Sequence, residues 1–208
     1  MGVITDAYVT VKEYKDRVGK TGTTADDNLL AQLTAVSRFL DARLGRNFGQ
    51  DSAVAVRVYD GNGLVRLWTD DISTSTGLIV KVDLDGDYLF TDETALTLDT
   101  DFWVGPANAD KAPESTPWQF LEVHPNSTRL SVWPYQRRAV QVTAKFGWPS
   151  VPNLIKEWVV ATTRQLRDME ESGFTLTLEN MDAAIRVSSQ SSYLLRDIER
   201  MYAGVPTF

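Results

Sequence analysis

The stretch Lys145–Glu171, KFGWPSVPNLIKEWVVATTRQLRDMEE, decides the fold because it joins two kinds of structure. It begins with an aromatic, strand-like ending, Phe146-Gly-Trp148, and then passes through two prolines into a long helical pattern. Pro152 fits the first turn of that helix, where a backbone N–H is not needed and the fixed φ of proline is already helical.

The helix predicted from Pro152 has a wide apolar stripe, which indicates one wall of a core. The stripe consists of Ile155, Val159, Thr162, Leu166 and Met169, widened by Leu154, Trp158 and Ala161. Its packing partner must come from elsewhere in the chain.

The first 47 residues are predicted to form two helices. Thr10 and Glu13 make a capping box for the first helix, and Gly19 ends it. Thr24 caps the second helix, and Gly45 ends it. The apolar stripe of this second helix is Leu29, Leu30, Leu33, Val36, Ser37, Leu40 and Leu44. We expect it to pack against the helix that begins at Pro152.

Residues 48–149 have the pattern of short strands separated by turns. Val54, Val56 and Val58 alternate with Ala55 and Arg57, which indicates a half-buried strand. Further strand candidates are 64–68, 78–82, 88–90, 96–98, 118–123, 129–132 and 140–146. Strands of this length and spacing predict a small antiparallel sandwich or barrel.

The predicted fold is therefore α+β, with a helical core from both ends of the chain and an inserted antiparallel β-domain. The expected parts are N-terminal helices in 1–47, a β-domain in 48–149, a long helix in 150–172 and a C-terminal arm in 173–208. Within the arm, 174–178 alternates like an extended segment, and 189–203 has the pattern of an amphipathic helix.

Composition excludes several classes of protein. The chain has no cysteine, which excludes disulfides and thiolate chemistry, and its single histidine, His124, argues against histidine metal clusters. The net charge of −7 argues against binding to the nucleic-acid backbone. No apolar run is long enough for a membrane span, and the N-terminus lacks the pattern of a signal peptide.

Carboxylates are the most prominent candidates for chemistry. Asp83, Asp85 and Asp87 invite a calcium site, but an EF-hand loop starting at Asp83 needs glycine where Tyr88 stands and glutamate where Thr94 stands. An acidic hairpin turn is the better interpretation. The pairs Asp70-Asp71, Asp92-Glu93 and Glu170-Glu171 fall in expected loops or helix ends, where solvated charge is the rule. We predict no catalytic residue, metal site or cofactor.

The six tryptophans leave an alternative open. They are Trp68, Trp103, Trp118, Trp133, Trp148 and Trp158. Most lie in or beside strand candidates, so core packing is favoured. A carbohydrate-binding or hydrolytic module on the β-domain remains the second hypothesis, and it requires a cleft lined by tryptophans and carboxylates.

The order of these elements resembles the head-to-tail connector (adaptor, or head completion) proteins of tailed bacteriophages. The matching segments are Tyr8-Val-Thr-Val-Lys-Glu-Tyr14, Asp26-Asp27-x-Leu29-Leu30, Leu40-Asp-x-x-Leu44-Gly-Arg46-x-Phe48, Tyr59-Asp-Gly61, Val80-x-Val82-Asp-x-Asp-Gly86, and Phe146-Gly-Trp148 with Val151-Pro152-x-x-Ile155. They are spread over most of residues 5–170.

The resemblance implies a non-enzymatic virion protein at the head–tail interface, assembled in the host cytoplasm. Such a protein forms a ring, expected to be a dodecamer, beneath the portal protein. The ring extends the DNA channel without specific DNA binding and docks the next connector or tail protein. A tail-completion or tail-terminator protein is a further alternative.

The C-terminal arm is the expected partner-binding segment. Its candidate contact residues are Phe174, Tyr193, Leu194, Ile198, Tyr202 and Phe208. The alternative is that this segment packs back onto its own helical core.

Overall fold

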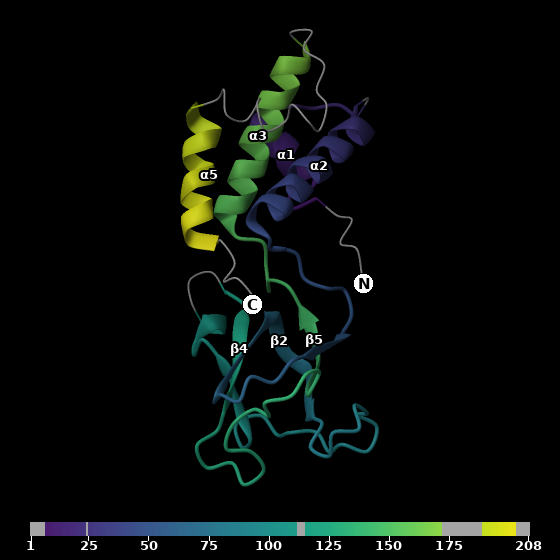
Figure 1. Cartoon of the computed structure of the whole chain (residues 1–208). Coiled ribbons are helices and arrows are strands. Elements are labelled where there is room, and N and C mark those ends of the chain that lie inside the picture. Colours follow the sequence, from purple (N-terminus) through teal and green to yellow (C-terminus); the bar gives the residue numbers. More distant parts are fainter. Residues whose placement is uncertain (1–6, 24, 112–114, 172–188, 203–208) are drawn as a thin grey trace. The chain divides into compact units, whose positions relative to one another are not determined.

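The computed structural model describes residues 7–23, 25–111, 115–171 and 189–202 (Figure 1). Within these residues the chain has four α-helices and a five-stranded antiparallel sheet, which confirms the α+β prediction. The strands belong to one compact unit, Gly49–Ser150, and the helices belong to a second.

Helix α1, Val11–Val18, begins and ends as its sequence predicts. The Thr10 side chain accepts from the Glu13 N–H, and the Glu13 carboxylate accepts from the Thr10 N–H, so the capping box is complete. Gly19 closes the helix in the left-handed conformation at φ 66°.

Helix α2, Asp26–Leu44, buries the predicted stripe except Leu30, which is exposed. Gly45 ends it at φ 61°. Its N-cap position is Ala25, which makes no side-chain cap hydrogen bond, whereas the predicted cap Thr24 lies outside the described residues.

Helix α3, Asn153–Glu171, begins one residue later than predicted. The carbonyl of Pro152 accepts from the Lys156 N–H at 3.1 Å, so Pro152 precedes the first turn. Helix α3 packs against α2, as predicted, and also against α5, Ser189–Tyr202. The buried side chains of α3 are Ile155, Trp158, Val159, Val160, Thr162, Thr163 and Leu166. No helix in the described ranges is long and apolar enough to cross a membrane.

Tyr8 ties the chain before α1 to the end of α2. Its hydroxyl donates to the Asp41 carboxylate and accepts from the Phe48 N–H at 2.8 Å. Its backbone N–H donates to Ser37 Oγ at 3.1 Å, and the Arg38 guanidinium lies 5.0 Å from its ring centroid. Burial together with the Asp41 charge raises the pKa of Tyr8, so its hydroxyl stays protonated and keeps donating.

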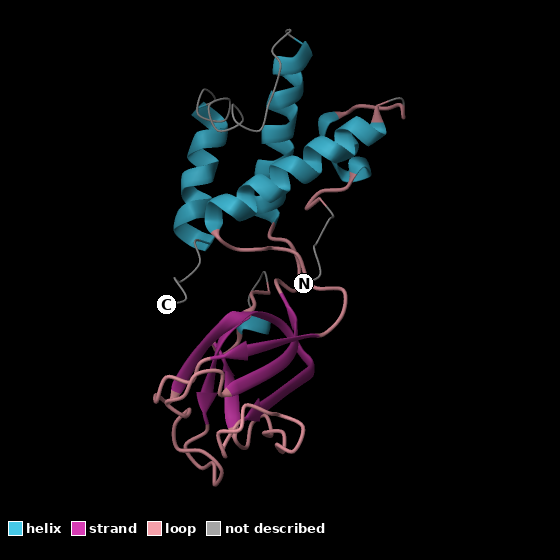
Figure 2. Cartoon of the chain, turned by 45° about the vertical axis from the view of Figure 1, so that its right-hand side comes forward, coloured by secondary structure: helices cyan, strands magenta, loops and turns pink. Residues whose placement is uncertain are grey.

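The sheet has the order β1-β5-β2-β4-β3, with every pair antiparallel. Its strands are the magenta arrows of Figure 2. The strands are β1 Ala55–Tyr59, β2 Arg66–Val82, β3 Phe102–Gly105, β4 Trp118–Val123 and β5 Val140–Phe146. The sheet is not closed, since β1 and β3 are its two edges. Its core includes Ile72, Phe102, Leu121, Trp133 and Phe146.

One long strand replaces two predicted ones. The candidates 64–68 and 78–82 both belong to β2, because the polar residues between them continue the strand. Its first half pairs with β4, through Arg66 to Ile72, and its second half pairs with β5, through Ile72 to Val82. Ile72 pairs with both neighbours, which lie on opposite edges of β2, and the register with β5 shifts on either side of Thr74.

Three other strand predictions are wrong. Residues 88–90 form no strand because the Asp83 carboxylate accepts from the Gly86 and Tyr88 N–H groups and curls the chain. Residues 129–132 form no strand, since the Arg129 and Leu130 N–H groups donate to Ser127 Oγ instead. Residues 96–98 contribute only isolated bridges. Strand β3 was not predicted.

Strand β1 presents its valines to solvent. A hydrophobic pattern alone would place them inside, but the register with β5 pairs Ala55 with Ala144 and Arg57 with Val142. Residues directly opposite in a sheet share a face, and Val142 and Ala144 are buried. Ala55 and Arg57 therefore face the core, and Val54, Val56 and Val58 are exposed.

The segment that enters the sheet unit is bonded to the segment that leaves it. Gly49 O accepts from the Trp148 N–H at 3.2 Å, and Gln50 bridges Gly147. Gly147 has φ 98°, and a Cβ there would lie 1.8 Å from Gly49 O. Only glycine permits this approach.

We predict that Gly147→Ala destabilises the protein by about 3 kcal/mol or more, from backbone strain combined with the clash. Gly86→Ala is the matched control. Gly86 also has a positive φ, 82°, but a Cβ there meets nothing within 4 Å, so the expected loss is about 1 kcal/mol. Urea unfolding measures both values, and equal losses would contradict the assignment of Gly147 to the closure.

Asp41 gives stability a predictable dependence on pH. Burial raises its pKa to about 6, despite the opposing effects of the Tyr8 hydrogen bond and the Arg38 charge. The pKa of Asp41 in the unfolded chain is about 3.9. Between about pH 4 and 6 the folded protein therefore holds a proton on Asp41 that the unfolded chain does not. The contribution of Asp41 is complete below about pH 4 and is lost as the pH rises through about 6.

Asp41→Asn should remove this pH dependence of the free energy of unfolding, because the amide stays neutral. We expect the free energy of unfolding of the unsubstituted protein to fall relative to that of the variant between about pH 4 and 6, the window set by the two pKa values. Chemical denaturation at each pH tests this. Parallel profiles would show that Asp41 has no raised pKa.

Candidate functional site

Helix α5 holds four of the six predicted contact residues, and most of them face the helical core. Ile198 is buried, while Leu194 and Tyr202 are half-buried. The Tyr202 ring meets the Phe48 ring edge-on at 5.6 Å, and Arg43 Nε lies 2.9 Å from the Glu199 carboxylate. Phe174 and Phe208 lie outside the described residues.

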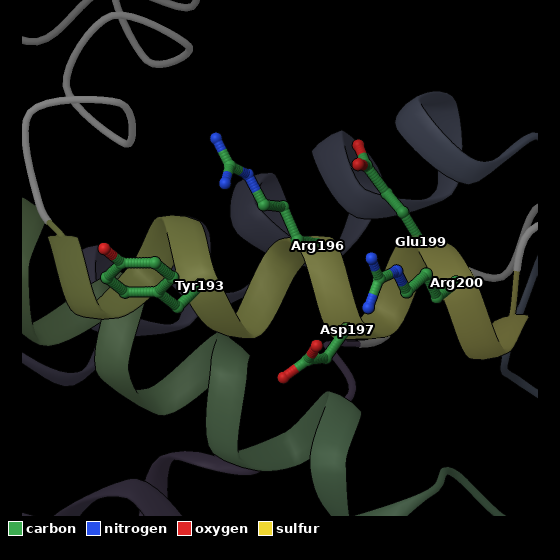
Figure 3. Close-up of a pocket in the computed structure, with 5 residues that line it drawn as sticks. All are labelled: Tyr193, Arg196, Asp197, Glu199 and Arg200. Carbon is green, nitrogen blue, oxygen red and sulfur yellow. The ribbon is translucent and has the colours of Figure 1, made fainter.

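Tyr193 is the predicted contact residue that α5 turns outward, with 65% of its surface exposed. It lines a hollow of about 490 Å³ along α5 (Figure 3). The described lining residues are Tyr193, Arg196, Asp197, Glu199 and Arg200. These side chains are charged or amphipathic, which suits a contact with a polar protein surface.

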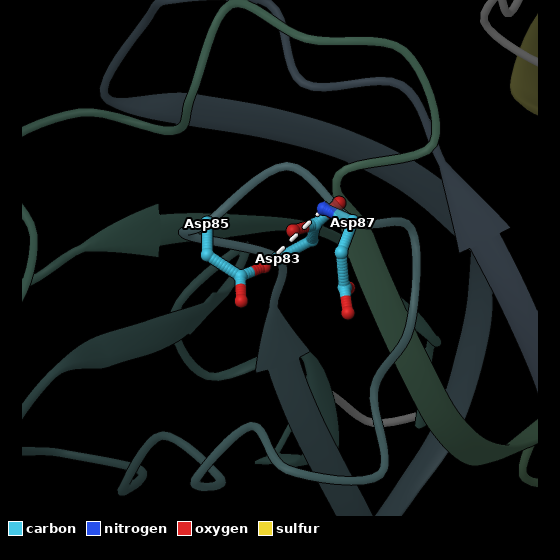
Figure 4. Close-up of side chains that lie close together, drawn as sticks. All are labelled: Asp83, Asp85 and Asp87. Atoms are coloured by element: carbon cyan, nitrogen blue, oxygen red, sulfur yellow. Dashed lines mark hydrogen bonds between the residues drawn. The ribbon is translucent and has the colours of Figure 1, made fainter.

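The predicted acidic turn is present, and its first residue organises it. Asp83, Asp85 and Asp87 bring carboxylate oxygens within 4.8 Å of one another (Figure 4). Asp83 is buried and accepts from the Gly86 N–H, the Tyr88 N–H and Gln136 Nε2 at 2.7 to 3.0 Å. Its carboxylate is therefore engaged in holding the loop.

One carboxylate of each of the three pairs is held by a nearby group. Asp70 accepts from Tyr59 and pairs with Arg57 at 2.7 Å, and Glu93 accepts from the Leu84 N–H. Glu170 contacts Gln32 on the helical unit. His124 uses Nδ1 to accept from the Asn126 N–H, in the predicted turn. Each of these groups has a structural role.

Core packing accounts for four of the six tryptophans. Trp133, Trp148 and Trp158 are buried and Trp118 packs half-buried against the sheet core, whereas Trp68 and Trp103 are exposed on the sheet. Trp68 meets Phe120 with an interplanar angle of 69°, and Trp103 meets His124 at 63°. Each exposed indole thus packs against a neighbouring ring of the sheet unit.

Two exposed apolar surfaces were missed by sequence reasoning. One is formed by the outward valines of β1, whose orientation only the pairing with β5 reveals. The other is the loop after Asp83, where Leu84, Tyr88 and Leu89 are exposed. Their alternation with aspartates is a sequence signal of an exposed loop, although the same pattern also fits a turn followed by a strand.

Comparisons with known proteins add little. The sequence matches no protein-family model and no curated protein. One similar solved chain comes from a structure described as the neck of an empty GTA particle computed with C6 symmetry. The two chains share 17% identity, the match covers 77% of this chain and 78% of that one, and the TM-score is 0.47. A likeness at this level does not assign a function.

We predict that Ile198→Ala lowers the free energy of unfolding by about 2 to 4 kcal/mol, because it leaves a cavity beneath α5. Tyr193→Ala on the exposed face of the same helix should change it by less than about 0.5 kcal/mol. Thermal and urea unfolding measure both. If Ile198→Ala were as mild as Tyr193→Ala, α5 would not be packed against α3 in solution.

Proposed function

We propose that this chain is a structural virion protein, a head-to-tail connector that forms a ring beneath the portal. The ring, a dodecamer by the resemblance, extends the DNA channel and docks the next connector or tail protein. The protein is not an enzyme. Its place is the virion head–tail interface, after assembly in the host cytoplasm.

The observation that supports this proposal most is the order of the connector-like segments along the chain. Three of the six segments contain residues with a definite structural role. Tyr8 ties the N-terminal segment to α2, Gly45 ends α2, Gly147 closes the sheet unit and Pro152 precedes α3. A shared order of several such segments along the chain is less easily obtained by chance than any single motif.

The electrostatics are compatible with DNA passing through the ring. The chain carries a net charge of −7, and a phosphate backbone is repelled by acidic surfaces. An acidic lining would let DNA move without binding it. Tight, salt-sensitive DNA binding by the purified protein would contradict this part of the proposal.

We assign the partner contact to the C-terminal arm, with distinct roles for its residues. Tyr193, Phe174 and Phe208 contact the portal or the next component. Ile198, Leu194 and Tyr202 fix α5 in position, as their burial supports. An exposed tyrosine on a helix held in place is a frequent anchor of protein interfaces.

The test is negative-stain microscopy and binding with purified portal rings. We expect the protein to add a ring-shaped layer to the portal, and Tyr193→Ala to weaken that binding about tenfold without loss of stability. Leu30→Ala, an exposed leucine on α2, is the control and should leave binding unchanged. A protein that never joins portal rings would refute the connector function.

A further inference from the structure

The outward side of β1 is an apolar patch without a partner in the described chain. Val56 is 59% exposed and pairs with Thr143, which pairs in turn with Ile79, 45% exposed. Val54 and Val58 flank Val56 on the same side, because side chains two apart share a face. We define the valine face as Val54, Val56, Val58 and Ile79.

The free edge of β1 is poorly suited to strand addition. Arg57 points inward, where its guanidinium lies 3.9 Å from the centroid of the Phe146 ring and 2.7 Å from the Asp70 carboxylate. An inward charge on an edge strand is a known protection against edge pairing. The surface offered for contact is therefore the face and not the edge.

A second apolar surface protrudes just after β2. In residues 84–89, the Asp83 loop, Leu84, Tyr88 and Leu89 are each 55 to 57% exposed. The buried Asp83 carboxylate fixes the loop through Gly86 and Tyr88, and Tyr88 is held at φ 62°. A loop already fixed in one conformation loses little entropy when it docks.

The two surfaces have opposite charge. The Asp83 loop carries Asp85 and Asp87 and no basic side chain, and Figure 4 shows both carboxylates beside the fixed turn. The valine face is flanked by Lys145 and Lys81, which lie on the same side of β5 and β2. The Lys145 ammonium group has no partner among the described residues, whereas Lys81 donates to the Phe90 carbonyl.

We infer that the Asp83 loop of one copy of this chain docks on the valine face of a second copy. Leu84, Tyr88 and Leu89 cover the valines, and Asp85 and Asp87 approach Lys145. Both surfaces are exposed within one chain, so neither covers the other. Because the contact joins two different patches, it repeats head to tail, and such a series forms a ring where the rotation between copies closes. This inference depends on the proposed function only in expecting that the series of contacts closes into a ring.

The absence of cysteine from the sequence makes this contact directly testable by cross-linking. Two variants, Val56→Cys and Asp85→Cys, are purified separately, mixed and treated with a mild oxidant. We expect disulfide dimers to form mainly between the two variants and much less within either one. Leu64→Cys, an equally exposed apolar position of the same unit, replaces Val56→Cys as the control.

Charge exchange provides a second measurement. Lys145→Glu in the Val56→Cys variant should reduce mixed dimers about fivefold, and Asp85→Cys combined with Asp87→Lys should restore them. Equal cross-linking with the Leu64→Cys control, or dimers formed equally within each variant, overturns the inference. Portal-bound rings without mixed cross-links overturn the inference but leave the connector function intact. Mixed cross-links in a protein that does not join portal rings support the inference and refute the connector function.

Discussion

The close approach of Gly147 to Gly49 is the constraint on which the sheet unit depends. The chain enters the sheet unit at Gly49 and leaves it at Trp148, and these two segments are hydrogen-bonded to each other. The approach requires a residue without a side chain and with a left-handed backbone. With the two ends joined, each unit packs its own core.

Local signals in the sequence were sufficient wherever neighbouring residues decide the structure. The Thr10–Glu13 capping box and the left-handed glycines Gly19 and Gly45 act within one helical turn, so they predicted helix limits correctly. Signals failed where a distant partner decides. The face of β1 follows from β5, about ninety residues away by the chain numbering, and buried Asp83 curls residues predicted to form a strand.

The candidate site shows the same division. The amphipathic pattern of α5 predicted a helix, but it did not say which of its residues face a partner and which face α3. Burial now separates Ile198 from Tyr193. The valine face was beyond prediction because only the pairing of β1 with β5 shows which side its valines face, whereas the Asp83 loop had a signal in the alternation of its apolar residues with aspartates.

Strand β2 has a consequence for the fidelity of folding. It pairs with β4 along its first half and with β5 along its second half, so both neighbours determine its hydrogen-bond register. A slip by one residue inverts every side chain of a strand. In β2 that error would turn Ile72 and Val80 outward at once and mismatch both sets of hydrogen bonds. Sharing one strand between two pairings thus makes incorrect registers costly twice over and leaves one arrangement strongly favoured.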